Sequence, residues 1–296
     1  MTPLVSICCI TYNHARFIRK CLDGFLIQET SFPIEILIHD DASTDGTDGI
    51  IREYADKYPD LILPLFETEN QYSQGKQNKI DFYNYRRARG KYIAYCEGDD
   101  YWTDPLKLQK QVDFMESHPD YSVCFHRWKH FDEATGLIRD DICNSVLKGN
   151  EDGIEITLDE FFKLWVTQPL TMVFRLSSFS FEWSPKYKFY RDSYEIYHLL
   201  KTGKGYLFSF CGGVHINHSG GIVSGESESR QRRMSLLIAK DLYENNKDCW
   251  TKQNYESNLQ WELYQKHIPL RERLSLSLEL FKLNGQFKTL VKNIIR

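Results

Sequence analysis

The chain has 296 residues, which is enough for one large domain or for one domain with an extension. Its formal charge of −4 and its pI near 6.2 argue against general nucleic-acid binding, and no run of about 18 apolar residues predicts a membrane-spanning helix. The eight cysteines show no Cys-x-x-Cys spacing; we expect neither a disulfide framework nor a signal peptide, which predicts a cytoplasmic protein.

The first predicted strand is a nearly continuous apolar run from Leu4 to Ile10, which is typical of a central parallel strand. It ends at the polar group Thr11-Tyr12-Asn13-His14. A helix is predicted next, because apolar residues recur on one helical face from Phe17 to Leu26.

A second strand is predicted over 34–38, and it ends at His39-Asp40-Asp41. We expect Ser43 or Thr44 to cap the helix that follows. The segment 61–66 predicts a short edge strand, because Pro64 has no N–H to donate to a sheet. A further helix is expected over 76–88.

The stretch 91–102 begins as a strand and ends as a cluster of acids. The buried run 92–96 is followed directly by Glu97-Gly-Asp-Asp100. Three carboxylates this close repel one another unless a cation sits among them, and carboxylate oxygens suit Mg²⁺ or Mn²⁺. The alternative is a solvated acidic turn. The buried strand before the cluster and the aromatic pair Tyr101-Trp102 after it favour the metal site.

Strands that alternate with helices predict an α/β fold, in which a mostly parallel sheet is flanked by helices. The three polar clusters then fall at the carboxyl edge of the sheet, where ligands bind in such folds. A dinucleotide site and a P-loop are both disfavoured, because neither glycine-rich fingerprint is present.

The second half predicts strands over 121–125, 171–174 and 205–210. A helix over 190–200 opens with Asp192, and Glu195 lies one turn later on the same face. The resemblance given below makes Asp192 a candidate general base, and Glu195 is the rival candidate. The alternative is that Asp192 is an acid that only favours the helix dipole.

Helices are predicted over 228–246, 253–267 and 270–292, in a part of the chain with an excess of Lys and Arg. We expect these helices to pack as a cap. The alternative is a peripheral membrane contact.

Three segments together resemble the donor site of family 2 glycosyltransferases with the GT-A fold: Ser6 to Asn13, Asp40 to Thr47, and Glu97 to Asp100. The resemblance covers about residues 1–225. It implies a GT-A catalytic domain over 1–225, a Rossmann-like α/β sheet flanked by helices, and a helical extension over 226–296. Glu97 departs from the family, which usually has Asp at that position.

The resemblance also implies roles for individual residues. Thr11, Tyr12 and Asp41 would contact the nucleoside, and Asp99, with Asp100 beside it, would lie near the metal and the diphosphate. His218, in a glycine-rich segment, would bind the metal or the diphosphate, and Asp192 would activate the acceptor. The implied cofactor is Mn²⁺ or Mg²⁺.

The predicted activity is inverting transfer of a sugar from a nucleotide-diphosphate sugar, expected to be a UDP-sugar, to a hydroxyl of a saccharide or lipid-linked saccharide in polysaccharide synthesis. The expected location is cytoplasmic, or peripheral at the inner membrane face if the C-terminal helices bind lipid. Two alternatives stay open: a metal-dependent sugar nucleotidyltransferase or phosphohydrolase, and a non-catalytic module that binds a sugar nucleotide.

Overall fold

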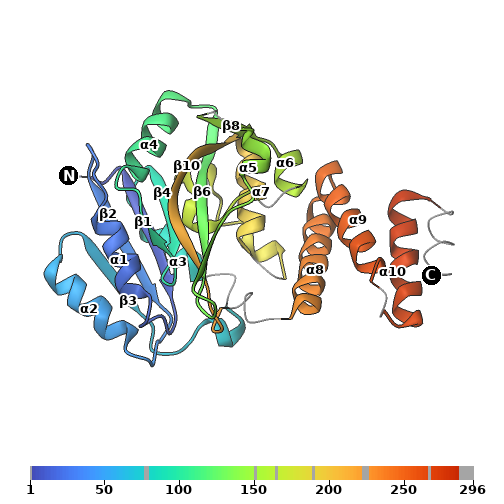
Figure 1. Cartoon of the computed structure of the whole chain (residues 1–296), viewed down its shortest axis with the longest axis horizontal. Helices are drawn as coiled ribbons and strands as arrows, with labels where there is room; N and C mark the ends of the chain where they lie inside the picture. The colour runs from blue at the N-terminus through green and yellow to red at the C-terminus, as the bar shows by residue number, and fades with distance from the viewer. Residues whose placement is uncertain are drawn as a thin grey trace. The chain divides into compact units, whose positions relative to one another are not determined.

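The computed structural model describes residues 2–76, 80–149, 152–163, 166–188, 191–221, 227–265 and 268–286. The chain forms two compact units (Figure 1). The first comprises Met1–Pro185 and Tyr190–His218, and the second comprises Lys186–Phe189 and Ser219–Arg296.

The first unit is built on one sheet of ten strands. Its main order is β3-β2-β1-β4-β9-β6-β10-β5, with β7 paired to β6 and β8 paired to β10. The first four strands in this order are mutually parallel, whereas β9 runs antiparallel to both β4 and β6. The strands are β1 Val5–Thr11, β2 Ile34–Asp40, β3 Ile62–Phe66, β4 Tyr92–Glu97, β5 Tyr101–Trp102, β6 Tyr121–Asp132, β7 Leu137–Asp140, β8 Gly153–Ile156, β9 Val173–Arg175 and β10 Lys204–Asn217.

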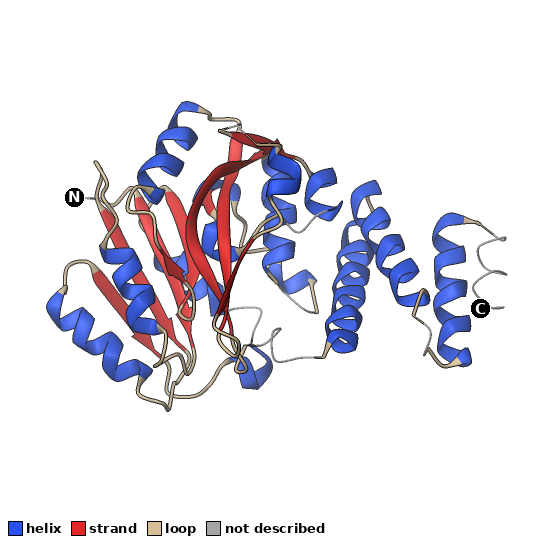
Figure 2. Ribbon diagram, viewed as in Figure 1, coloured by secondary structure: helices blue, strands red, loops and turns tan. Residues whose placement is uncertain are grey.

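Helices flank this sheet (Figure 2), as the alternating pattern predicts. They are α1 Ile18–Leu26, α2 Thr47–Lys57, α3 Ile80–Arg87, α4 Lys107–Ser117, α5 Asn144–Leu147, α6 Leu158–Lys163 and α7 Asp192–Thr202. The apolar stripe of α1 is buried, as expected from its 3.6-residue period. Gly24 lets α1 approach β5, because a Cβ at Gly24 would lie 2.8 Å from the backbone of Trp102.

Two local predictions have different outcomes. The segment with Pro64 is an edge strand, β3, and that prediction is confirmed. The predicted cap of α2 is wrong, since the N-cap residue is Gly46, which is in a left-handed conformation (φ 95°) and has no side chain to cap the helix. Ser43 is used elsewhere: its N–H and its hydroxyl both donate to the carboxylate of Asp40.

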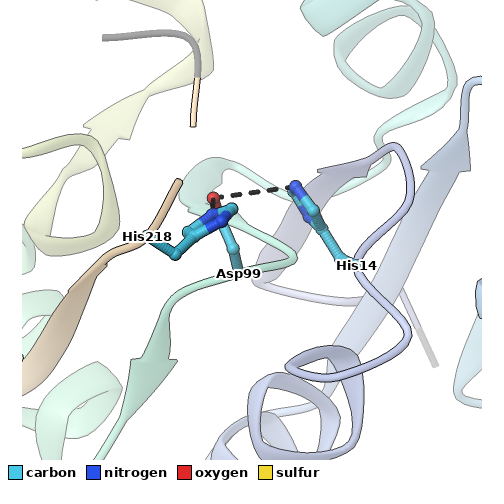
Figure 3. A group of neighbouring side chains, drawn as sticks. All are labelled: His14, Asp99 and His218. Atoms are coloured by element: carbon cyan, nitrogen blue, oxygen red, sulfur yellow. Dashed lines mark hydrogen bonds and ion pairs between the residues drawn. The ribbon is translucent and has the colours of Figure 1, made fainter. Parts of the chain in front are cut away.

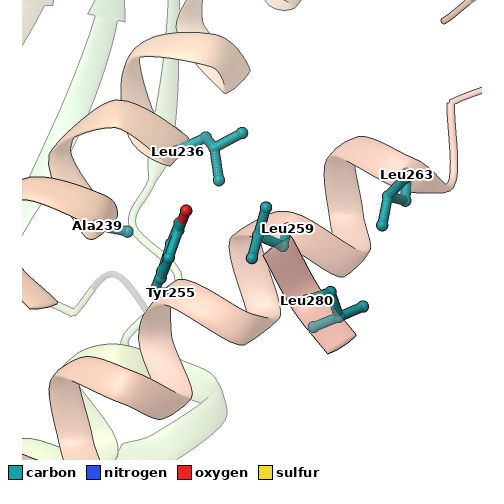
Figure 4. Close-up of a cluster of buried hydrophobic side chains, with 6 residues drawn as sticks. All are labelled: Leu236, Ala239, Tyr255, Leu259, Leu263 and Leu280. Carbon is teal, nitrogen blue, oxygen red and sulfur yellow. The ribbon is translucent and has the colours of Figure 1, made fainter. Parts of the chain in front are cut away.

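The second unit contains three helices among its described residues: α8 Glu228–Asn246, α9 Cys249–Leu263 and α10 Leu270–Asn284. The predicted end of the last helix, at 292, lies outside the described residues. The helices share a buried apolar cluster (Figure 4) made of Leu236, Ala239, Tyr255, Leu259, Leu263 and Leu280. Within the described ranges of the chain, no helix has both the length and the apolar character needed to span a membrane.

Candidate active site

The carboxyl ends of β1, β2 and β4 lie side by side. Thr11 is opposite Asp40 in the β1–β2 pair, and Ile10 is opposite Glu97 in the β1–β4 pair. Two backbone hydrogen bonds continue past the strands, from Asp41 N to Thr11 O (3.0 Å) and from Gly98 N to Ile10 O (2.8 Å). The prediction that the three polar clusters share one edge of the sheet is confirmed.

The loops after β1 and β2 are tied to each other by side chains. Asn13 accepts a hydrogen bond from Thr44 N (2.8 Å) through Oδ1, and its own N–H donates to Ser43 Oγ (2.9 Å). The N–H of Ala15 donates to Asp45 Oδ2 (3.0 Å). Asn13 adopts φ 55°, a left-handed conformation that Asn tolerates better than most residues. These contacts connect the loop after β1 directly to the loop after β2.

Gly98 is required where the loop after β4 meets the loop after β1. A Cβ at this position would lie 2.7 Å from Thr11 Oγ1 and 3.1 Å from His14 Nδ1. No side chain fits at such distances without moving its neighbours. The glycine in the Glu97–Asp100 cluster therefore lets the acids of one loop approach the polar residues of the other.

A two-residue strand joins the acidic cluster to the far end of the sheet. In β5, Tyr101 pairs with Val214 and Trp102 with Gly213 of β10, and these strands are antiparallel. The indole N–H of Trp102 also donates to Leu170 O (2.8 Å). The antiparallel register brings the residues after Val214 back along the acidic cluster.

Asp100 is fully buried and binds the returning strand. Its Oδ1 accepts a hydrogen bond from Ile216 N (2.9 Å) and lies 3.0 Å from His215 Nδ1. Burial raises the pKa of Asp100. Burial alone would lower the pKa of His215, but the negative charge of Asp100 outweighs this effect, and the pKa of His215 is raised. Asp100 therefore has a structural role, and its role as a metal ligand stays a prediction.

Asp99 lies between two histidines from distant parts of the chain (Figure 3). Its Oδ2 is 3.0 Å from His218 Nε2 and 3.6 Å from His14 Nε2. The three side chains are only 14%, 7% and 16% exposed, in the order Asp99, His218 and His14. Asp99 Oδ1 and His14 Nδ1 are buried, and neither has a hydrogen-bond partner among the described residues. A bound cation would satisfy a carboxylate oxygen left in this way.

Electrostatics favour an ionised carboxylate between the imidazoles. Burial opposes the ionisation of Asp99, but the hydrogen bond with His218 and the nearby His14 outweigh it and lower the pKa of the carboxyl below its usual 3.8. Burial lowers the pKa of His14. Phe17 packs beside the two imidazoles, and the centroid of its ring lies 4.6 Å from that of His218 and 6.5 Å from that of His14.

Two sets of side chains could hold a metal ion: His14 with Asp99 and His218, and Glu97 with Asp99 and Asp100. Ligand atoms within each set lie within 4.8 Å of one another. Asp99 belongs to both sets, and its residue type and its buried Oδ1 fit a divalent cation. His14 was missed as a candidate from the sequence, although it stands directly after the polar end of β1, where a search for His near the predicted acids would have found it.

The predicted nucleoside residues lie at the same edge of the sheet. Thr11 is buried, and Tyr12 is 45% exposed. Asp41 is buried, and its carboxylate accepts hydrogen bonds from the backbone N–H groups of Gln71 (2.7 Å) and Tyr72 (3.0 Å). In this structure Asp41 fixes the loop after β3 above the edge, and its contact with a nucleoside stays a prediction.

Asp192 is the first residue of α7, as predicted. The residue is partly buried, and burial around the carboxyl group raises its pKa above the usual 3.8. Glu195 is buried and accepts a hydrogen bond from the Tyr85 hydroxyl (3.1 Å). The carboxylate of Glu195 is therefore held in the core by this hydrogen bond. The catalytic role of Asp192 stays a prediction.

The sequence matches the model of glycosyl transferase family 2 over residues 6–181. An uncharacterised protein of Mycobacterium tuberculosis is 50% identical over 122 residues, which are 41% of this chain and 34% of that protein. A putative teichuronic acid biosynthesis glycosyltransferase of Bacillus subtilis, TuaG, is 37% identical over 114 residues, 38% of this chain and 42% of the relative. The chain thus spans less than half the length of these curated relatives.

Two solved structures show the same fold. TarS of S. aureus, residues 1–349 in complex with UDP-GlcNAc, has a TM-score of 0.65 and 19% identity, and the match covers 94% of this chain and 80% of TarS 1–349. A mannosyltransferase of Pyrobaculum calidifontis in complex with GDP-Man and Mn²⁺ has a TM-score of 0.55 and 17% identity, and covers 100% of this chain and 86% of that chain. These matches confirm the predicted GT-A fold.

Proposed function

The chain belongs to glycosyl transferase family 2, and we propose that this glycosyltransferase moves a sugar from a nucleotide-diphosphate sugar to an acceptor hydroxyl with inversion at the anomeric carbon. The observation that supports the donor chemistry best is the position of Asp99. It stands at the carboxyl edge of the parallel strands, largely enclosed between two imidazoles, with Oδ1 unpartnered among the described residues. This edge is where α/β folds bind nucleotides.

Asp99 and His218 would hold a divalent cation at this edge, with Asp100 supporting the loop. A bound Mn²⁺ or Mg²⁺ would offset the charge that develops on the leaving nucleoside diphosphate. The oxygen of Asp99 and the neighbouring imidazole suit such an ion. The complex of the mannosyltransferase with Mn²⁺ supports this cofactor for a related fold.

Thr11, Tyr12 and Asp41 would bind the nucleoside. Tyr12 is exposed enough to offer its ring to a base, and Asp41 fixes the adjacent 70–72 loop through backbone hydrogen bonds. The TarS complexes with UDP-GlcNAc and UDP support a uridine nucleotide as the donor. The mannosyltransferase complex with GDP-Man supports a guanosine nucleotide as the alternative.

Asp192 would take the proton from the acceptor hydroxyl as that oxygen attacks the anomeric carbon. The raised pKa of its carboxyl makes it a stronger base than an ordinary aspartate, and the residue remains ionised above that pKa. Inversion follows from a single displacement in which the acceptor attacks opposite the leaving diphosphate.

We propose a saccharide or lipid-linked saccharide as the acceptor, in a polysaccharide pathway. The name of TuaG supports this class of product, although the relative extends well beyond the matched segment. The first 225 residues would form the catalytic domain and the rest a helical extension. A cytoplasmic enzyme, with its C-terminal helices at the inner membrane face, would suit a lipid-linked acceptor.

The test is a panel of UDP- and GDP-sugars assayed with Mn²⁺ and with simple saccharide acceptors. Product analysis should show a new glycosidic bond and a released nucleoside diphosphate, and NMR should show an inverted anomeric centre. Retention at that centre would contradict the single displacement. Formation of a nucleoside monophosphate or free phosphate, with no glycosidic product, would contradict transfer and indicate nucleotidyl or phosphohydrolase chemistry.

A further inference from the structure

We propose that His14 is a direct ligand of the metal ion, so that His14, Asp99 and His218 form a site of two imidazoles and one carboxylate that binds Co²⁺ or Zn²⁺ more tightly than Mg²⁺. The inference rests on the proposed metal-assisted transfer and adds to it a residue and a metal preference. The three residues are drawn together in Figure 3.

The first argument is the convergence of two ring nitrogens on one oxygen. Nε2 of His218 and Nε2 of His14 lie 3.0 Å and 3.6 Å from the same Asp99 oxygen, Oδ2. The longer distance exceeds the usual range of a hydrogen bond, so hydrogen bonding to Asp99 does not account for the position of His14. Ligand atoms about 2.0–2.2 Å from one ion stand about 3–4 Å apart, and the potential ligand atoms here lie within 4.8 Å.

The second argument is that backbone contacts and packing hold His14 in place, since among the described residues the only polar contact of its ring is the 3.6 Å approach of Nε2 to Asp99, and Nδ1 has no hydrogen-bond partner. Its carbonyl accepts hydrogen bonds from Phe17 N (2.9 Å) and Ile18 N (2.8 Å), which fixes the backbone at the start of α1. Gly98 leaves the space that the ring occupies, because a Cβ there would be 3.1 Å from Nδ1. Phe17 packs against the same side chains.

The third argument concerns the buried polar atoms. Asp99 Oδ1 and His14 Nδ1 have no hydrogen-bond partner in the described part of the chain. Leaving a polar atom buried and unpaired is unfavourable, because the atom loses its hydrogen bonds to water and gains none in return. An ion bound by Asp99 and the two Nε2 atoms would compensate the lost hydrogen bonds of the carboxylate. Such an ion would also explain why the His14 ring lies beside Asp99.

The competing set of three acids is less available. Asp100 Oδ1 already accepts the N–H of Ile216 and pairs with His215. Both sets include Asp99, so one ion can be bound by only one of the two sets. Oxygen-only sets suit Mg²⁺, whereas imidazole nitrogens favour later divalent metals, in the order Mg²⁺ below Mn²⁺ below Co²⁺.

The first experiment is calorimetric titration of the full chain, free of nucleotide, with Co²⁺, Mn²⁺ and Mg²⁺ in turn. The wild type should bind Co²⁺ most tightly, and His14→Gln should weaken Co²⁺ binding by about 10-fold or more, while Mg²⁺ changes less. The matched control is His118→Gln, because His118 is exposed and lies outside the cluster. Equal Co²⁺ affinity in wild type and His14→Gln overturns the proposal.

The second experiment does not depend on the folding of a His14 variant. Pulsed EPR of Mn²⁺ bound to His218→Gln reports any imidazole nitrogen that still coordinates the ion. A nitrogen coupling in this variant supports His14 as a ligand, since His218 is absent. Bound Mn²⁺ with no nitrogen coupling overturns the proposal.

The outcomes separate this inference from the proposed function. If a sugar nucleotide is used but His14→Gln leaves the metal preference unchanged, the transferase assignment stands and the role of His14 fails. If the metal binds through both histidines but no sugar nucleotide reacts in the donor panel, the ligand set stands and the proposed reaction fails.

Discussion

The Asp99 carboxylate lies 3.0 Å from Nε2 of His218, although 119 residues separate the two along the chain. Their contact is produced by a strand of only two residues, β5, which pairs antiparallel with β10. The contact therefore depends on the register of this pair, and the candidate site is assembled from both halves of the first unit.

The first prediction is that Asp99→Asn mimics removal of the metal. The variant keeps the shape of the side chain but loses the charge that would hold the ion. Binding of UDP with Mn²⁺ should weaken by at least about 10-fold, since even outer partners of metal ligands typically contribute about 10–100-fold. Calorimetry with and without EDTA measures this effect. Asp113→Asn is the control, because Asp113 lies outside the cluster and its carboxylate accepts a hydrogen bond from the side chain of Gln109 (2.7 Å) on the same helix. If the wild type binds UDP equally well with and without EDTA, the metal has no role in donor binding.

The second prediction concerns Gly98. A Cβ at this position would meet Thr11 Oγ1 at 2.7 Å, so Gly98→Ala should destabilise the fold by about 1–3 kcal/mol and weaken Mn²⁺ binding as the two loops separate. The matched control is Gly49→Ala, in the exposed part of α2, where nothing lies within 4 Å of an added Cβ. Gly49→Ala should stabilise by about 0.5–1 kcal/mol, because Ala favours a helix. Thermal unfolding checks both values, and a neutral Gly98→Ala would show that the loops are not closely packed.

Lys107 is an unexpected residue on the buried face of α4. Its ammonium lies 3.9 Å from the centroid of the Trp102 ring, and Nζ has no hydrogen-bond partner among the described residues. Burial lowers the Lys107 pKa from 10.5 to about 7. Between these two pKa values the unfolded chain holds a proton that the folded chain lacks, so this residue makes stability rise with pH across that window.

The third prediction follows from that sign. Lys107→Met fills a similar space without an ionisable group, and should stabilise the protein near pH 6–7 by about 1–3 kcal/mol. The advantage should shrink as pH rises from about 7 toward 10, because the wild-type lysine becomes neutral in both states. Denaturant unfolding at several pH values measures the difference. A difference that does not change with pH would show that Lys107 keeps its ordinary pKa.

The carboxyl edge of the sheet could be predicted because it depends on local patterns. Apolar runs that end in acids fix both the strands and the ends at which their polar residues gather, and Thr11, Asp41 and Asp99 all lie where the pattern puts them. The start of α7 at Asp192 followed in the same way from its sequence.

The remaining parts of the site depend on contacts between distant segments. A two-residue strand such as β5 has no periodicity to detect, so the approach of His218 to Asp99 required the structure. The predicted cap of α2 failed because the hydroxyl oxygen of Ser43 accepts the N–H of Asn13, while the N–H and hydroxyl of Ser43 donate to Asp40.

The fourth prediction tests the proposed membrane contact of the C-terminal helices. Deleting α10 would be a poor test, because Leu280 belongs to the buried cluster of the second unit. Exposed Trp261 and Tyr264 are better targets, and replacing both with Ser should reduce co-sedimentation with anionic liposomes several-fold. Ile138→Ser, at an exposed position in β7, is the control. Failure of the full chain to co-sediment at low salt would leave these helices as a packed extension.

The last prediction concerns the base, for which Asp192 and Glu195 were the two candidates. Glu195 is buried and accepts the hydroxyl of Tyr85, so its carboxylate is held inside the fold. Asp192 opens α7, and burial raises the pKa of its carboxyl, which makes the ionised carboxylate a stronger base than that of an ordinary aspartate. Asp41 is bound to two backbone N–H groups and Asp99 to histidine, which leaves neither well placed to serve the acceptor.

Asp192→Asn should therefore lower the rate of sugar transfer by about 10²- to 10⁴-fold, the usual contribution of a positioned base. Donor affinity should stay within about twofold of wild type, because the change lies on the acceptor side of the reaction. The wild-type rate should fall as acid protonates Asp192, at a pH above the usual 3.8 because its pKa is raised, and this limb should vanish in the variant. Glu195→Gln is the matched control: the amide oxygen can still accept from Tyr85, and transfer should change little. Near-normal transfer by Asp192→Asn, or a collapse of donor binding, would place the base elsewhere.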